Sequence, residues 1–307
     1  MNTETEKIVK EIGKVVKGKE RIVRKVVAAI LAQGHVLLED IPGVGKTTLA
    51  LALAGTMDLK YRRMQFTPDV LPSDIVGFMM YNSGTRAFEY REGAIFCNLF
   101  LADEINRTSA KTQSALLEAM EEGKVTVEGQ TYRLPAPFCV IATENPVGSS
   151  GTQLLPESQL DRFLIQLSMG YPSADAAVEI LKNSARPILQ EIQSVITVER
   201  LQELQQMTAD MYVDDKLYEY IVKLTELTRH DERIRLGVSP RGSIALLKMA
   251  KATALMRGGE YVIPEDVLDV IADTWAHRIR LSSKAKAEGL NTTQVIMELS
   301  ERISTIG

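Results

Sequence analysis

The spacing of apolar and polar residues divides the chain into two parts. In the first part, short apolar runs alternate with segments of helical spacing. Three runs have strand length, at 35–38, 99–102 and 138–143. They are apolar on both faces, which is typical of interior strands in a parallel sheet. Three segments have helical spacing, at 4–33, 47–57 and 108–122. The first part is therefore predicted to be an α/β fold.

Strand signals stop near Pro172, and the rest of the chain reads as helices. Turn residues interrupt these helices near Thr197, Val213, 237–240 and 258–264. The change near 171–176 predicts two domains, an α/β domain at 1–173 with a central parallel sheet and an all-helical domain at 174–307.

Two stretches of the first part do not fit the alternation of strands and helices. Residues 124–134 form two alternating runs about a Glu-Gly-Gln turn, which predicts a β-hairpin. The window 80–88 is predicted to be a loop or hairpin tip that could contact a partner.

Composition narrows the class of protein only slightly. The chain has 307 residues, 45% of them hydrophobic, and a net charge of −4, so its overall charge does not favour nucleic acid. The N-terminus lacks the apolar core of a signal peptide, and the longest apolar run, 26–32, is too short to span a membrane. Cys97 and Cys139 lie in apolar segments, where buried reduced thiols are expected. These features predict a cytoplasmic protein.

A glycine-rich loop between an apolar run and a helix is the strongest chemical signal. It predicts a nucleotide phosphate site formed by Pro42, Gly43, Val44, Gly45, Lys46, Thr47 and Thr48. In such a loop, backbone N–H groups and the helix N-terminus point at the phosphates. Lys46 would contact the β- and γ-phosphate oxygens, and the Thr47 hydroxyl would ligate Mg²⁺. The full pattern has glycine at position 40, where this chain has Asp40.

Polar residues at two strand ends complete the predicted chemistry. Asp103 and Glu104 follow one apolar run, and Asn145 follows the next. Ligands of open α/β sheets bind at the carboxyl ends of the strands. Asp103 could hold Mg²⁺ through water, and Glu104 could deprotonate the water that attacks the γ-phosphate. Asn145 could position that water or contact the γ-phosphate.

Two arginines are candidates to stabilise charge in the transition state. Arg162 lies in a Leu-Asp-Arg-Phe segment, and Arg241 lies in the first turn of a helix opened by Ser239 and Pro240. The three histidines are scattered without metal-ligand spacing, and no Ser/His/Asp or Cys/His arrangement is visible.

Taken together, these motifs resemble those of MoxR-type AAA+ ATPases. The segments that carry the resemblance occur in the family's order, at 43–47, 101–107, 113–120, 142–146, 160–163 and 239–241. The resemblance covers about 15–281. It departs from the family at Asp40 and at Glu144, where glutamine is more usual.

The resemblance implies roles that the pattern alone does not. It implies a P-loop AAA+ domain with a helical lid domain, an ATP and Mg²⁺ site, and assembly into a ring, usually a hexamer. Val16 and Gly18 would lie beside the adenine, and Asn145 would be the first sensor. Arg162 would be the arginine finger that acts on the next subunit, and Arg241 the sensor arginine of the lid.

The same resemblance implies how the protein meets its partners. An insertion at 74–96 and the hairpin at 124–134 would face the central pore of the ring. Partners would be client proteins, together with von Willebrand factor A domain proteins that bind metal. Three alternatives stay open at this point. They are a nucleic-acid motor of the related helicase branch, a metal-chelatase ATPase subunit, and a nucleotide-dependent scaffold with little hydrolysis.

Overall fold

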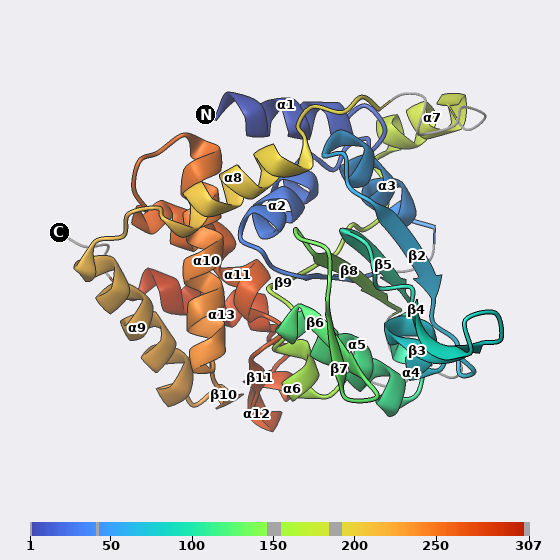
Figure 1. The fold of residues 1–307 in the computed structure, drawn as a ribbon. Helices are drawn as coiled ribbons and strands as arrows, with labels where there is room; N and C mark the ends of the chain where they lie inside the picture. Colours follow the sequence, from blue (N-terminus) through green and yellow to red (C-terminus); the bar gives the residue numbers. More distant parts are fainter. Residues whose placement is uncertain (1, 41–42, 146–154, 184–191, 304–307) are drawn as a thin grey trace.

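The computed structural model describes residues 2–40, 43–145, 155–183 and 192–303 (Figure 1). A twisted sheet with helices on both sides forms one half of the view, and a group of helices forms the other half. Within the described residues, no helix is both long enough and apolar enough to cross a bilayer.

The central sheet has five parallel strands in the order β2-β5-β8-β1-β9. Their bounds are β1 (Val36–Glu39), β2 (Tyr61–Gln65), β5 (Leu99–Asp103), β8 (Cys139–Glu144) and β9 (Ile165–Leu167). The three strands expected from apolar runs are the three central ones. The two edge strands, β2 and β9, were not predicted. β2 reads Tyr-Arg-Arg-Met-Gln and is only partly buried, and β9 is three residues long, so neither has the apolar pattern of an interior strand.

Two hydrophobic clusters cover the two faces of this sheet. On one face, Leu38, Leu101 and Ile141 pack with helices α1 (Thr3–Ile12), α2 (Glu20–Leu31) and α3 (Lys46–Thr56). On the other face, Leu37 and Phe100 pack with α4 (Pro72–Val76) and α5 (Ala110–Glu122). Alternate residues of one strand belong to different clusters because successive side chains point to opposite faces.

The N-terminal segment is two helices, so the expectation of one helix over 4–33 was wrong. α1 ends before Gly13 and α2 begins at Glu20. Gly18, between them, has φ +69°, a left-handed conformation that glycine adopts without strain and that a helix excludes. The chain turns here, so that α1 packs against α2 and α3.

Two β-hairpins extend from the α/β part. One is formed by β3 (Gly77–Asn82) and β4 (Ala87–Glu92), and it contains the window predicted as a hairpin tip. The other is formed by β6 (Lys124–Val127) and β7 (Gln130–Arg133), as predicted. The rings of Tyr90 and Tyr132 stack at 3.8 Å between centroids, so the two hairpins contact each other.

The remaining chain is mainly helical, although the sequence predicted helices alone beyond residue 173. The helices are α6 (Glu157–Leu160), α7 (Ala174–Asn183), α8 (Val198–Ala209), α9 (Asp215–His230), α10 (Pro240–Arg257), α11 (Pro264–Trp275), α12 (Ser283–Ala287) and α13 (Thr292–Glu301). Thr197 and Ser239 accept N-terminal capping bonds at predicted breaks, and Gly258 ends α10 in a left-handed conformation. A short antiparallel pair, β10 (Ile234–Leu236) with β11 (Arg280–Leu281), accompanies these helices.

Candidate active site

The loop between β1 and α3 has the geometry of a phosphate cradle. Gly43 and Gly45 have φ of +85° and +97°, and a Cβ atom on Gly43 would meet nothing within 4 Å. α3 begins at Lys46 and has no side-chain cap, so the N–H groups of its first turn are available to an anion. Pro42 lies outside the described residues.

Lys46 lies at the centre of a charged group. Its side chain is buried, and its Nζ donates a hydrogen bond to the Asp40 carbonyl oxygen at 2.7 Å. Burial lowers the pKa of Lys46, and four carboxylates act in the opposite direction, those of Asp40, Asp103, Glu104 and Glu144. Thr47 and Thr48 follow in the same turn and are half-buried. Lys46 and the predicted metal and base residues therefore lie in one electrostatic environment.

Asp103 ends β5 and is held from two sides. Its Oδ1 accepts a hydrogen bond from the Thr143 hydroxyl at 2.6 Å. Its Oδ2 accepts from Arg63 at 2.7 Å. Thr143 also accepts a hydrogen bond from the Glu104 backbone N–H at 2.8 Å, so one hydroxyl fixes both acidic residues.

Glu104 has an uncommon backbone conformation and two side-chain partners. Its φ is +58°, which is rare for a residue other than glycine and marks a constrained position. Oε1 accepts from the Asn145 amide at 2.9 Å, and Oε2 accepts from Arg107 at 2.8 Å. The Asn145 carbonyl oxygen in turn accepts from Asn106 at 3.1 Å. The predicted base and the predicted sensor are therefore in direct contact.

Arg162 and Arg241 lie together, and both approach an acidic residue that was not among the predicted site residues. Both approach the carboxylate of Glu121 at the end of α5, with Arg162 Nε at 3.5 Å from Oε2 and Arg241 at Oε1. Asp161 supports this arrangement, because it accepts hydrogen bonds from the Ser239 hydroxyl at 3.0 Å and from Arg278 at 2.8 Å. The helical part and the α/β part thus meet at these two arginines.

Val16 and Gly18 lie in the loop between α1 and α2. Val16 is buried in the larger hydrophobic cluster. A Cβ on Gly18 would lie 3.2 Å from the Ala176 Cβ of α7. The neighbouring Lys19 Nζ donates to the Tyr171 carbonyl oxygen at 2.8 Å. The end of this loop at Gly18 and Lys19 therefore packs against the segment that leads out of the sheet.

The residues present fit a magnesium nucleotide. In the described part of the chain, no cluster of three or more His, Cys, Asp or Glu side chains could hold a metal ion by itself. Magnesium is usually bound by one or two carboxylates, water and substrate phosphates, and the Asp103 carboxylate and the Thr47 hydroxyl are oxygen donors of the kind that such a site requires.

Glu144 and Glu39 form a carboxylate pair at the ends of β8 and β1. They are aligned in the register of these strands, and Glu39 accepts a hydrogen bond from Gln166 at 2.5 Å. Burial and the neighbouring Glu39 charge raise the pKa of Glu144 to about 7. Arg280 and Lys46 oppose the shift.

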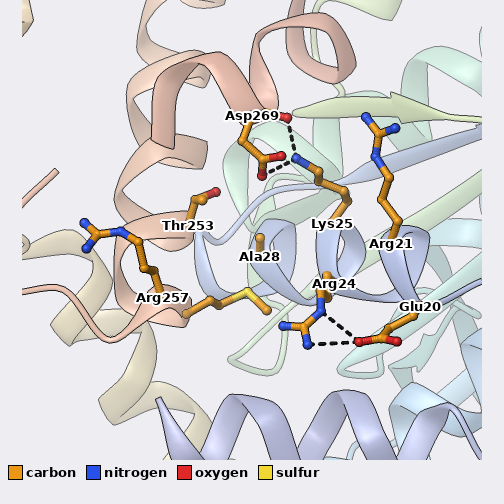
Figure 2. A pocket seen from close by; sticks show the side chains of 9 residues that line it. Glu20, Arg21, Arg24, Lys25, Ala28, Thr253, Arg257 and Asp269 are labelled. Atoms are coloured by element: carbon orange, nitrogen blue, oxygen red, sulfur yellow. Dashed lines mark hydrogen bonds and ion pairs between the residues drawn. The ribbon is translucent and has the colours of Figure 1, made fainter. Parts of the chain in front are cut away.

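A pocket of about 470 Å³ lies between α2 and the pair α10 and α11, and none of its lining residues belongs to the phosphate loop (Figure 2). Its cations are mostly paired. Lys25 contacts the Asp269 carboxylate at 2.5 Å, Arg24 contacts Glu20, and Arg257 pairs with Asp266 at 3.0 Å. The pocket therefore lies at the contact between α2 and the helical part, and ion pairs occupy most of its charged side chains.

Sequence reasoning missed several residues of the site. Thr143, Arg63 and Arg107 hold the two acidic residues. Thr143 could have been found, because the strand that ends at Asn145 lies beside the strand that ends at Asp103. Nothing in the sequence around Glu121 indicated a role in the site, because only the packing of α10 brings Arg241 to its carboxylate.

Two family models match the chain. The model of the ATPase family associated with various cellular activities (AAA) matches residues 35–165, and the model of the AAA lid domain matches residues 226–299. With the five-stranded sheet and the phosphate cradle, these matches define a P-loop ATPase of the AAA+ class with a lid domain.

The relatives define the branch of that class. The chain is 49% identical to protein YeaC of Bacillus subtilis, over 97% of this chain and 93% of the relative. It is 37% identical to Chaperone MoxR1 of Mycobacterium tuberculosis, over 97% and 81% of the two chains. A crystal structure from Cytophaga hutchinsonii, provisionally assigned as an ATPase, matches with a TM-score of 0.92 and 37% identity, over 100% and 96% of the chains. The chain therefore belongs to the MoxR family of AAA+ ATPases, and the resemblance seen in the sequence is confirmed.

Proposed function

We propose that this ATPase hydrolyses ATP with Mg²⁺ and uses the energy to remodel or activate partner proteins. The convergence of Lys46, Asp103, Glu104 and Asn145 on the cradle side of the sheet supports the hydrolytic step. Bound Mg²⁺ supplies charge neutralisation at the β- and γ-phosphates, and Thr47 and Asp103 would hold it.

The residues of the chain divide the work between binding and proton transfer. Gly43, Val44 and Gly45, with Pro42 and Thr48 beside them, would surround the phosphates, and Lys46 would contact the β- and γ-phosphate oxygens. Val16 and Gly18 would line the adenine side. Glu104 would accept a proton from the attacking water, since each of its carboxylate oxygens has only one of the two contacts, with Asn145 or with Arg107, and keeps a further lone pair. Asn145 would then orient that water.

We also propose that the chain acts in a homo-oligomeric ring, with a hexamer as the expected size. Arg162 and Arg241 both lie at Glu121, and a neighbouring subunit's γ-phosphate would offer Arg162 a second anion. In this arrangement Arg162 is the finger and Arg241 the sensor arginine of the lid. We propose a domain boundary at 173–174, directly before α7 begins at Ala174.

Client proteins would meet the hairpins. The β3–β4 hairpin in the proposed insertion at 74–96 exposes Phe78, Tyr81 and Phe88, and the hairpin at 124–134 lies against it. Exposed apolar side chains of this kind suit transient contact with an unfolded or partly folded protein. Partners with von Willebrand factor A domains are included in this proposal, and the cytoplasmic location stays a prediction.

Purified protein tests the hydrolytic proposal directly. Lys46→Ala and Glu104→Gln should each lower Mg²⁺-dependent ATP turnover to near zero, because one removes phosphate binding and the other the base. Glu104→Gln should still bind ATP. A Glu104→Gln rate within twofold of the parent would show that the base is assigned wrongly.

The client is identified with the same variant. Glu104→Gln, stalled with ATP, should retain protein partners that Lys46→Ala does not retain. A tenfold stimulation of turnover by DNA or RNA would instead support a nucleic-acid motor. Retention of a tetrapyrrole metal-insertion subunit would support the chelatase alternative.

A further inference from the structure

Asp40 occupies the position where the phosphate-loop pattern has glycine, and both oxygens of its carboxylate accept hydrogen bonds. The residue is 5% exposed. Its Oδ1 accepts hydrogen bonds from the Ser168 hydroxyl at 2.8 Å and from the Gly170 N–H at 2.9 Å. Its Oδ2 accepts a hydrogen bond from the Met169 N–H. All three donors lie directly after β9, on the path from the sheet to α7.

The segment 168–176, here called the strap, also contacts the phosphate loop at its other end. The Met169 side chain is buried, and its Cε lies 3.8 Å from the position of a Cβ on Gly45. Asp40 opens the loop and Gly45 closes it, so the strap contacts both ends of the turn that would hold the phosphates.

Further along, the strap contacts the predicted adenine side. The Tyr171 carbonyl oxygen accepts from Lys19 Nζ at 2.8 Å. A Cβ on Gly18 would lie 3.8 Å from the Ser173 hydroxyl oxygen and 3.2 Å from the Ala176 Cβ. One stretch of chain therefore connects the phosphate end of the nucleotide site with its base end.

Asp40 also acts on Lys46 through its main chain. Its carbonyl oxygen accepts the hydrogen bond from Lys46 Nζ, and its backbone N–H donates to the Glu144 carbonyl oxygen at 3.2 Å. The carboxylate fixes the strap while the backbone fixes the lysine. A glycine at this position could keep the backbone contacts but would leave three donors without their acceptor, and one of them, the Met169 N–H, is buried.

We propose that Asp40 is a positioning residue that anchors the strap to the phosphate loop, so that the two ends of the nucleotide site are held as one rigid unit. This inference rests on the proposed nucleotide function. It assigns a role to the one residue that departs from the phosphate-loop pattern. Removal of the carboxylate should weaken nucleotide binding at both ends of the site, even where the replacement restores the usual glycine.

The test compares Asp40→Gly, Asp40→Asn and Ser168→Ala with the parent, in full-length protein. Fluorescent ADP titration measures affinity, steady-state ATPase assays separate KM from kcat, and hydrogen exchange reports on residues 168–173 without nucleotide. Asp40→Gly should weaken ADP binding about tenfold, raise KM for ATP to a similar extent, lower kcat far less, and speed exchange at Met169 and Gly170. Ser168→Ala removes one of three bonds, so its effect on affinity should be about twofold.

The outcomes separate this inference from the proposed function. A parent protein that does not bind ADP would contradict the proposed function, while the exchange measurement would still test the anchor. Asp40→Gly with ADP affinity within twofold of the parent would overturn the inference, as would weaker affinity with unchanged exchange in the strap. If Asp40→Gly does not fold, Asp40→Asn gives the same comparison, because its amide N–H₂ would face the Met169 N–H and only one acceptor oxygen remains.

Discussion

The strand-end cluster and the arginine cluster are built in different ways. The strand-end cluster, Asp103, Glu104, Thr143 and Asn145, comes from the ends of two adjacent strands, and short hydrogen bonds connect its members. The arginine cluster, Arg162, Arg241 and Glu121, brings together a loop, the first turn of α10 and the end of α5.

The two clusters should respond differently when the helical part moves against the sheet. Strand register holds the first cluster within a single subunit, and it changes only if the sheet itself changes. The second cluster depends on how the helical part is placed against α5, so a shift of the helical part would separate Arg241 from Arg162. Substitutions in the two clusters should therefore fail in different ways.

After the losses expected for Lys46→Ala and Glu104→Gln, the largest expected effect comes from breaking the arginine cluster. Arg162→Ala should lower ATP turnover about 10³-fold, because it removes a charge that would stabilise the γ-phosphate in the transition state. Mixing Arg162→Ala with Lys46→Ala should restore part of the activity, since each subunit supplies what its neighbour lacks. Arg200→Ala serves as the control, because this half-buried arginine of α8 also pairs with carboxylates, those of Glu4 and Glu203, but contacts neither cluster. Absence of restoration in mixtures would count against action between subunits.

Protonation of Glu144 at the strand ends should give a pH-dependent stability. The pKa of Glu144 is raised from its usual 4.5 to about 7, so the folded state binds the proton more tightly than the unfolded state. The contribution of this group is therefore full at low pH and is lost as the pH rises from 4.5 through 7. At about 1.4 kcal/mol per pKa unit, the upper limit of this loss is about 3 kcal/mol.

Urea unfolding of the parent and Glu144→Gln at pH 5 and pH 8 measures this effect. The two proteins should have similar free energies of unfolding at pH 5, and the variant should be the more stable at pH 8. Parallel stability curves for the two proteins would show that Glu144 titrates normally.

Thr143→Val tests the strand-end cluster with almost no change of shape. The hydroxyl bonds to Asp103 and to the Glu104 N–H are lost, so turnover should fall about tenfold to a hundredfold while ATP binding changes less. Thr253→Val, which removes a hydroxyl within α10, should leave the rate unchanged. Mixtures with other variants should not restore Thr143→Val subunits, and restoration would mean that this cluster too spans subunits.

The smallest expected effect concerns Glu121. Glu121→Gln keeps the shape of the side chain but removes the charge that both arginines approach, so turnover should fall about threefold to tenfold. Glu122→Gln, next to it on α5 and paired with Lys124, is the matched control. Equal rates for the two variants would show that Glu121 does not orient the arginines.

Much of the α/β part could be predicted because its signals are local. The central strands are apolar runs, Ser109 and Gly123 cap α5 through contacts within a few residues, and the β6–β7 hairpin follows from its turn. The edge strands were missed because a polar sequence such as Tyr61–Gln65 becomes a strand only by pairing with β5. The break at Gly13–Lys19 was missed because apolar spacing continues on both sides of it.

The candidate site shows the same limit. The phosphate loop, the acidic pair and the family could all be predicted from the types and order of the residues, because each is recognised from short stretches of sequence. The carboxylate of Asp40 reaches its partners across about 130 residues of chain, and Arg241 reaches Glu121 across about 120. Contacts at such separations are set by sheet order and by the packing of α10, and these carry no local pattern. The sequence by itself therefore determined the class of chemistry, and the tertiary structure decided which residues hold the site together.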